Sequence, residues 1–222
     1  MRAVRFIVFD LDGTLVDSRK DIADAANTLL ETCGAEPLAE ERIGRMVGDG
    51  AAVLVARAFD AAGQTPPPDA LQRFLAIYNR RLLDHTRTYA GVPEMLEALR
   101  ARAPLAVLTN KPLASTRRIL EALDLARFFS PDAVVGGDGP FPRKPDPAGL
   151  LHLAAAAGTR PDQTLLVGDS LIDWRTARRA GSAICIARYG FGSEGFHTEE
   201  LQAVDLAIDT PFDLVALYTN DT

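Results

Sequence analysis

The chain has 222 residues, of which 47% are hydrophobic and 24% are charged, and its formal net charge at pH 7 is −6. This composition is typical of a globular protein that is long enough for one large domain, or for a core with a smaller appendage. Acidic and basic residues are interleaved along the sequence, so no basic face of the kind that tracks phosphate backbones is indicated. We therefore expect no nucleic-acid partner.

The sequence contains no signal for a membrane or for secretion. No hydrophobic run approaches the roughly 20 residues that a membrane-spanning helix needs. The N-terminal segment is interrupted by Asp10 and lacks the small-residue cleavage site of a signal peptide. The two cysteines, Cys33 and Cys185, lie far apart without the spacing of a disulfide framework or a metal site. The sequence therefore predicts a cytoplasmic protein with no membrane association.

The first predicted element is a buried strand, VRFIVF (residues 4–9), which is followed at once by Asp10 and Asp12. Residues two apart on a strand face the same side, roughly 6–7 Å from each other. The two carboxylates should therefore lie together and repel each other, which raises the pKa of at least one unless a positive group sits between them. We expect such a group at this strand end.

The next segment, from about residue 16 to residue 84, shows helical patterns and no convincing strand. Hydrophobic residues recur at i, i+3 and i+4 from Ile22 onward, with Asp17 or Ser18 as the N-cap and Gly34 as the stop. Further helices are predicted over residues 39–46, 51–62 and 69–83. We therefore expect an inserted small α-helical cap over residues 16–84, and a discontinuous α/β core over residues 1–15 and 85–222.

Short apolar runs return after the helical block, at LAVLT (105–109), AVVG (133–136), TLLVG (164–168) and AICIA (183–187). Runs that are apolar throughout suit strands buried on both faces of a parallel sheet. Helical patterns over residues 112–124 and 146–157 lie between them. This alternation predicts a three-layer, Rossmann-like α/β core with a parallel sheet.

Polar residues follow the ends of four predicted strands. They are Asp10 and Asp12, then Thr109, Asn110 and Lys111, then Lys144, and finally Asp169 and Asp173. Open α/β sheets bind ligands beyond the carboxyl ends of their strands, so we expect these side chains to share one crevice. Carboxylates without His or Cys suit a hard cation, and Mg²⁺ is usually held by one or two carboxylates together with substrate phosphate. Positioning and charge neutralisation are what phosphoryl transfer needs, and a carboxylate can itself be the nucleophile.

Simpler interpretations of the same residues stay open at this point. Asp10 and Asp12 are compatible with a plain turn, because aspartate favours strand ends and DG is a turn dipeptide. Thr109 is equally suited to capping the next helix, and Lys111 to a solvated turn. Asp173 fits a helix N-terminus, where a negative charge is stabilised by the helix dipole.

The stretches DLDGTLVDS, LTNKP, RKPDP and GDSLID resemble, in order and spacing, the four motifs of the haloacid dehalogenase superfamily of phosphatases. The helical block resembles the type-1 cap of that family. The resemblance implies that Asp10 is the nucleophile that forms an aspartyl-phosphate. It also implies that Asp12 is first the general acid for the leaving oxygen and then the base that activates water.

The same resemblance implies roles for the other strand-end residues. Thr109 and the backbone of Asn110 would hold the phosphoryl group, while Lys144 would balance its charge. Mg²⁺ would bind to Asp10, to the carbonyl of Asp12 and to Asp169, with Asp173 as support.

Within the superfamily, LTNKP, GGDGPFPRKPDP and RYGFGSE look most like the phosphoglycolate phosphatases, which implies 2-phosphoglycolate as substrate. Relatives acting on sugar phosphates, pyrophosphate or N-acetylmuramate 6-phosphate share most of these motifs, and a phosphomutase differs only in its cap. A non-catalytic phospho-acceptor of the response-regulator type is a third alternative. The presence of Asp12 disfavours this alternative, because a second acid beside the nucleophile promotes hydrolysis of the phospho-aspartate, which a phospho-acceptor needs to keep.

The cap loop around Arg45, Gly48, Asp49 and Gly50 is expected to select the substrate, because the strand-end motifs contact only the phosphoryl group. A loop with two glycines can bring its backbone close to a small ligand. Arg45 could pair with a substrate carboxylate in a bidentate contact, although a surface arginine on a helix fits the pattern as well. We expect a small phosphorylated metabolite as the partner, and a monomer or homodimer.

Overall fold

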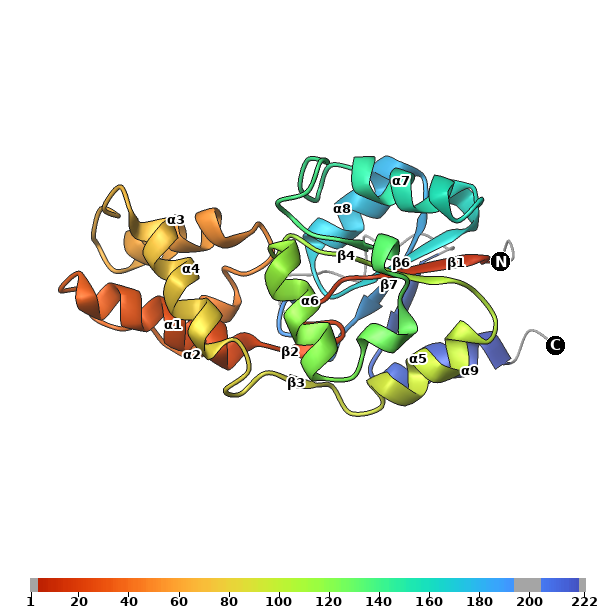
Figure 1. The fold of residues 1–222 in the computed structure, drawn as a ribbon, viewed down its shortest axis with the longest axis horizontal. Helices are drawn as coiled ribbons and strands as arrows, with labels where there is room; N and C mark the ends of the chain where they lie inside the picture. The colour runs from red at the N-terminus through yellow and green to blue at the C-terminus, as the bar shows by residue number, and fades with distance from the viewer. Residues whose placement is uncertain (1–3, 194–204, 220–222) are drawn as a thin grey trace.

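The structure is a computed structural model that describes residues 4–193 and 205–219. Figure 1 shows an α/β part at one end of the long axis and a group of four helices at the other. The start of the first strand and the end of the last helix both lie in the α/β part, away from the four helices. No helix in the described part of the chain is long and apolar enough to cross a membrane.

Six strands form one parallel sheet in the order β5-β4-β1-β6-β7-β8. The strands are β1 (Phe6–Phe9), β4 (Leu105–Leu108), β5 (Val134–Val135), β6 (Thr164–Gly168), β7 (Ala183–Ala187) and β8 (Leu206–Ile208). β1 lies inside the sheet, with Ile7 paired to Leu105 of β4 on one side and to Leu165 of β6 on the other. The five predicted strands are confirmed. The edge strand β8 was not predicted, because three residues are too few to give a recognisable pattern.

Helices cover both faces of this sheet, which confirms the predicted three-layer core. α5 (Val92–Arg100), α6 (Leu113–Ala122) and α9 (Pro211–Thr219) pack in the cluster that contains Ile7 and Phe9 of β1. α7 (Ala148–Ala156) and α8 (Leu171–Ala180) pack in the cluster that contains Phe6 and Val8. Neighbouring residues on β1 therefore bury their side chains in opposite layers. Short 3₁₀ helices occupy Ala126–Phe128, Pro131–Ala133 and Pro161–Gln163.

The helical block consists of α1 (Arg19–Thr32), α2 (Glu40–Gly44), α3 (Ala51–Ala61) and α4 (Ala70–Arg81), as the sequence predicts. Gly34 adopts a φ of 75° just after α1, the left-handed conformation that suits glycine at a helix stop. Ser18 is the N-cap of α1, but its hydroxyl donates to the Asp12 carboxylate and makes no cap hydrogen bond. The start of this helix is thereby tied to the loop after β1.

A two-stranded antiparallel ribbon links the helical block to the core. It is formed by β2 (Val16–Asp17) and β3 (Arg87–Thr88), with Val16 opposite Thr88. Strands of two residues carry no periodicity, so the sequence did not predict them. The cap boundaries at residues 16 and 84 stay a prediction. The two strands of the ribbon lie close to these two boundaries.

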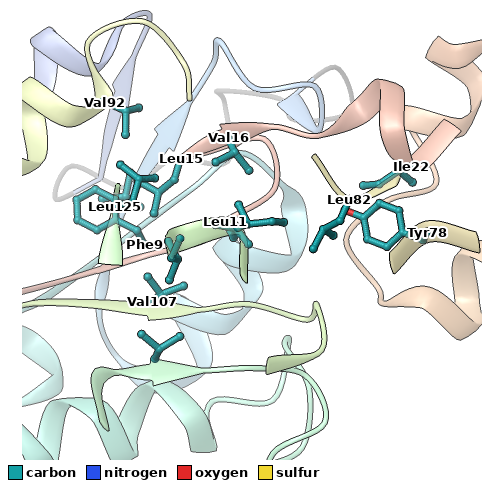
Figure 2. Packing of buried hydrophobic residues seen from close by; sticks show 14 of the residues in the cluster. Phe9, Leu11, Leu15, Val16, Ile22, Tyr78, Leu82, Val92, Val107 and Leu125 are labelled. Carbon is teal, nitrogen blue, oxygen red and sulfur yellow. The ribbon is translucent and has the colours of Figure 1, made fainter. Parts of the chain in front are cut away.

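The hydrophobic core does not stop at the ribbon. The buried cluster on one face of the sheet continues from Phe9 through Leu11 and into the helical block at Ile22, Tyr78 and Leu82 (Figure 2). Burial of apolar side chains is the main favourable contribution to folding, so the helical block is stabilised against the core by a shared cluster as well as by the two connecting strands.

A fully buried carboxylate holds the chain where it leaves the helical block. Asp21 on α1 accepts hydrogen bonds from the backbone N–H of His85 at 3.0 Å and from that of Thr86 at 2.8 Å. It also accepts the hydroxyl of Thr86 at 2.7 Å. These bonds satisfy the two donors of Thr86, which is itself buried and has little access to water.

We expect Asp21→Ala to lower the free energy of unfolding by roughly 2–4 kcal/mol, because it leaves the buried donors of Thr86 without an acceptor. Urea unfolding measures the change. The matched control is Asp24→Ala on the same helix, whose carboxylate is 26% exposed and forms surface ion pairs; it should cost less than about 1 kcal/mol. Equal losses in the two variants would contradict this role of Asp21.

Candidate active site

A cavity of about 60 Å³ lies between the carboxyl ends of the strands and the helical block. The core contributes polar side chains to its lining, and the helical block contributes mainly apolar ones. From the core come Asp10, Asp12, Thr109, Asn110, Lys111 and Asp169; from the helical block come Ile22, Val47, Gly48, Gly50, Leu54, Phe74 and Tyr78, among others. The structure therefore confirms that residues from several strand ends line one cavity.

Asp10 lies directly beyond the end of β1. Its backbone N–H still donates to Val167 of the neighbouring strand at 2.8 Å, which fixes its position. Its Oδ1 accepts the backbone N–H of Leu11 at 2.7 Å and lies 2.8 Å from Nζ of Lys144. Burial raises the pKa of Asp10 to about 7, in spite of the opposing charge of Lys144.

Asp12 has a separate environment. Its Oδ2 lies 3.0 Å from Nζ of Lys111, and its Oδ1 accepts the hydroxyl of Ser18. Asp10 and Asp12 lie beyond β1, which ends at Phe9, so the strand geometry assumed for the pair does not apply, although both residues line the cavity. Each carboxylate has its own buried lysine.

Lys144 joins two of the carboxylates. Its Nζ lies 2.8 Å from Asp10 and 2.6 Å from Asp173, and its side chain is 2% exposed. Burial acts to lower the pKa of Lys144, but the two carboxylates outweigh it and raise that pKa above its usual value. Lys144 is therefore a charged and buried lysine, as a site residue at this strand end would be.

Asp169 follows β6 directly, and Asp173 lies in the first turn of α8. Asp173 accepts the hydroxyl of Ser170 at 2.6 Å and the Ser170 backbone N–H at 3.2 Å, in a capping box. It thus caps the helix and also contacts Lys144. Asp169 accepts the backbone N–H of Gly192 at 2.8 Å. Burial, followed by the charges of Asp173 and Asp10, raises the pKa of Asp169 well above its usual value.

Gly13 makes room for Asp169. The φ of Gly13 is 81°, and a Cβ placed there would lie 1.8 Å from Oδ2 of Asp169. Both the left-handed backbone and the close approach therefore require glycine after Asp12.

The residues present fit a divalent cation. Asp10, Asp169 and Asp173 are buried and each offers an oxygen within 4.8 Å of the others. Three carboxylates lie together with the one ammonium of Lys144, and burial raises the pKa of both Asp10 and Asp169. Oxygen ligands without nitrogen or sulfur are those of a hard cation. The side chain of Asp12 is not in this group.

Thr109 and Asn110 follow β4 and are both buried. The Thr109 hydroxyl oxygen accepts the backbone N–H of Lys111 at 3.2 Å. The Asn110 side-chain amide donates to the carbonyl of Gly48 in the helical block and to that of Lys144, both at 2.8 Å. Asn110 thus connects the loop between α2 and α3 to the loop that carries Lys144.

Lys111 is buried, so its interpretation as a solvated turn residue is wrong. Its Nζ lies 3.0 Å from Asp12 and donates to the hydroxyl oxygen of Tyr78 on α4 at 2.6 Å. Burial raises the pKa of Tyr78 to about 12, against the charge of Lys111. Tyr78 is not recognisable as a site residue from the sequence, because a tyrosine four residues after Phe74 fits the apolar side of an amphipathic helix.

The predicted cap loop is only partly at the cavity. Gly48 and Gly50 line it. Asp49 instead pairs with Arg57 at 2.7 Å, and Arg45 is exposed and is not among the residues that line the cavity. The structure therefore does not bring Arg45 and Asp49 together with the strand-end residues.

The chain is similar to known proteins over most of its length. The family model of the haloacid dehalogenase-like hydrolases matches residues 7–187. A Rhodospirillum rubrum protein named phosphoglycolate phosphatase is 44% identical over 197 residues, which cover 85% of this chain and 81% of that protein. Another of that name, from Nitrosospira multiformis, is 42% identical over 205 residues, covering 89% of this chain and 88% of that protein.

A solved structure supports the same relationship. The crystal structure of a "predicted phosphoglycolate phosphatase" from Haemophilus somnus 129pt matches this fold with a TM-score of 0.89 at 32% identity. The match covers 98% of this chain and 99% of that one. The stretch RYGFGSE, used in the sequence analysis, is described up to Ser193, and Glu194 lies outside the described residues.

We expect Lys144→Met to destabilise the metal-free protein by about 3–5 kcal/mol at pH 8, because it leaves buried carboxylates unpaired. Loss of Lys144 raises the pKa of Asp10 further above its unfolded value, so the folded state binds more protons than the unfolded state and stability falls as pH rises. The loss should therefore be smaller at pH 5.

Urea unfolding in excess chelator at both pH values measures this difference. Lys20→Met, which removes an exposed lysine of α1, is the control and should cost little at either pH. The same loss for Lys144→Met at pH 5 and pH 8 would contradict the proposed charge balance.

Proposed function

This chain belongs to the haloacid dehalogenase-like hydrolases, and we propose that it is a Mg²⁺-dependent phosphatase that hydrolyses 2-phosphoglycolate to glycolate and phosphate. The family that the four motifs indicate is thereby confirmed, and the substrate, the metal and the mechanism are the proposal. The observation that carries it is the cluster of buried carboxylates around Lys144, with a further carboxylate, Asp12, held beside it on a different lysine.

The two aspartates have different tasks in the proposed reaction. An Asp10 oxygen attacks phosphorus, and the bond between phosphorus and the ester oxygen breaks as Asp12 donates a proton to that oxygen. Glycolate leaves, and Asp10 carries the phosphoryl group. Asp12, now a carboxylate, takes a proton from water as the water attacks phosphorus, and the bond to Asp10 breaks to release phosphate.

The other strand-end residues position and neutralise the phosphoryl group. Lys144 supplies positive charge next to Asp10, and Thr109 with the backbone of Asn110 donates hydrogen bonds to phosphoryl oxygens. When bound to Asp10, the Asp12 carbonyl and Asp169, with Asp173 as support, Mg²⁺ supplies further positive charge to these oxygens. The fixed geometry of these groups means that little reorganisation is needed during the reaction.

Two observations favour an enzyme over a phospho-acceptor domain. Asp12 is close enough to contribute to the raised pKa of Asp10, as an acid that serves the same reaction must be. The cavity is also covered by the helical block, which can exclude bulk water from the reacting groups. A persistent phospho-aspartate requires neither feature.

The choice of 2-phosphoglycolate rests on the names of the similar proteins and on the small cavity. Sugar phosphates, N-acetylmuramate 6-phosphate, pyrophosphate and a mutase reaction are the alternatives. We further propose a cytoplasmic location, with a monomer or a homodimer as the active form.

Phosphate release from a panel of small phosphate esters tests the substrate. The highest kcat/KM should be that for 2-phosphoglycolate. A clearly higher value for a sugar phosphate or for pyrophosphate, or isomerisation of a sugar phosphate without phosphate release, would replace the proposed activity with one of the alternatives.

We expect Asp10→Asn to abolish turnover, and Asp12→Asn to lower it by about 10²–10⁴-fold, the usual contribution of a general acid or base. Because Asp12 serves both steps, Asp12→Asn should form one equivalent of glycolate slowly and then release phosphate more slowly still. Rapid-quench measurement of both products checks this. An Asp10→Asn variant within about tenfold of wild type would contradict the nucleophile assignment.

Mg²⁺ should also stabilise the folded protein, because it binds a site that the unfolded chain lacks. At a free concentration of about 100 times the Kd, the gain is about 2.7 kcal/mol, which differential scanning calorimetry can detect at roughly 2–4 °C per kcal/mol.

Asp169→Asn should remove most of this gain. Its metal-free form should be as stable as wild type or more so, because a buried charge is lost. Asp60→Asn, at an exposed position of α3, should keep the full gain. An unchanged Mg²⁺ effect in Asp169→Asn would place the metal elsewhere.

A further inference from the structure

Among the described residues that line the cavity, Lys111 is the one basic side chain. The remaining lining consists of acidic, small polar, glycine and apolar residues. Lys144, the other lysine of the site, is not among these lining residues, and its ammonium lies against Asp10 and Asp173. A negative group of a ligand that lies in this cavity outside the phosphoryl site can therefore pair with Lys111.

The geometry leaves Lys111 with capacity for another acceptor. A lysine ammonium has three donors. Two partners are found within the described part of the chain, Asp12 at 3.0 Å and the hydroxyl oxygen of Tyr78 at 2.6 Å. The side chain of Lys111 is only 5% exposed, so water has little access to the remaining donor. A second negative partner would form a charge-assisted hydrogen bond with this buried ammonium and stabilise its charge.

Tyr78 supplies a second donor at the same place. It accepts the hydrogen bond from Lys111, so its own O–H is available to donate. Nζ of Lys111 also lies 4.5 Å from the centre of the Tyr78 ring, which holds the ammonium against the aromatic face. Lys111 comes from the loop after β4 and Tyr78 from α4, so the pair joins the core to the helical block.

We propose that Lys111 and Tyr78 bind the carboxylate of the substrate and thereby select a phosphoester that carries a carboxylate beside its ester carbon. This inference rests on the proposed function, in which Asp12 protonates the ester oxygen. In 2-phosphoglycolate a single methylene group separates that oxygen from the carboxylate. Since Lys111 lies 3.0 Å from Asp12, the carboxylate reaches the ammonium when the ester oxygen reaches Asp12.

The pair also discriminates against other small phosphate esters. A sugar phosphate places a neutral carbon with a hydroxyl where the carboxylate would be. A buried site that is built for a charged group rejects ligands lacking it, because its own groups are then left incompletely paired. This role falls to Lys111 rather than to Arg45, the exposed arginine that the sequence offers as a candidate.

The experiment compares kcat/KM for 2-phosphoglycolate and for ethyl phosphate, which has a methyl group in place of the carboxylate. In Lys111→Met the loss should be roughly 10- to 100-fold greater for 2-phosphoglycolate than for ethyl phosphate, the effect of one hydrogen bond to a charged group. The inhibition constant of glycolate should rise by a similar factor. Lys20→Met is the matched control and should behave as wild type with both substrates.

Equal losses with both substrates would overturn the proposal and leave Lys111 as a positioning residue for Asp12. Tyr78→Phe provides a second test that keeps the ring and the fold. Its loss should be about 3- to 10-fold and confined to 2-phosphoglycolate; a loss shared by both substrates, or none, would overturn the role of the hydroxyl.

The wild-type protein separates this inference from the proposed function. Wild type that hydrolyses ethyl phosphate as well as it hydrolyses 2-phosphoglycolate overturns both the substrate and the role of Lys111. Wild type that prefers 2-phosphoglycolate, with the same preference in Lys111→Met, overturns only the role of Lys111.

Discussion

Mutual repulsion of buried carboxylates at the carboxyl edge of the sheet is the constraint around which the rest of the molecule is arranged. Asp10, Asp169 and Asp173 offer oxygens within 4.8 Å of one another, with a single ammonium, that of Lys144, among them. Burying unpaired charge is costly, and the pKa values of Asp10 and Asp169 rise accordingly. Such a cluster is stable only where strand ends, a helix N-terminus and tight turns hold it in place.

The two lysines divide the site into two halves. Lys144 pairs with the carboxylates at which we place the metal and the phosphoryl group, and Lys111 pairs with Asp12 next to the cavity. Both ammonium groups are buried, so each lysine acts through fixed contacts. The hydrogen bonds of Asn110 to Gly48 and of Lys111 to Tyr78 extend these contacts into the helical block. The helical block that covers the cavity is therefore hydrogen-bonded to the same residues that position the charged groups.

The sequence predicted the strand-end residues well, because buried parallel strands appear as unbroken apolar runs and the polar residues follow them directly. It could not predict contacts that depend on tertiary structure. Tyr78 and Asp21 belong to ordinary amphipathic helices, and only the fold reveals what they meet. β1 ends at Phe9, so strand geometry does not describe how Asp10 and Asp12 lie relative to each other. Arg45 has the charge needed to pair with a substrate carboxylate and lies close to Gly48 in the sequence. In the structure it follows α2 and is exposed.

Locating the phosphoryl group on the protein tests the central claim most directly. The enzyme would be quenched in acid during turnover of 2-phosphoglycolate, reduced with borohydride and analysed by peptide mass spectrometry. Reduction of an aspartyl-phosphate converts that residue to homoserine. Our account predicts homoserine at position 10 and at no other acid of the site; modification of Asp12, Asp169 or Asp173, or of none of the four while turnover proceeds, would contradict it.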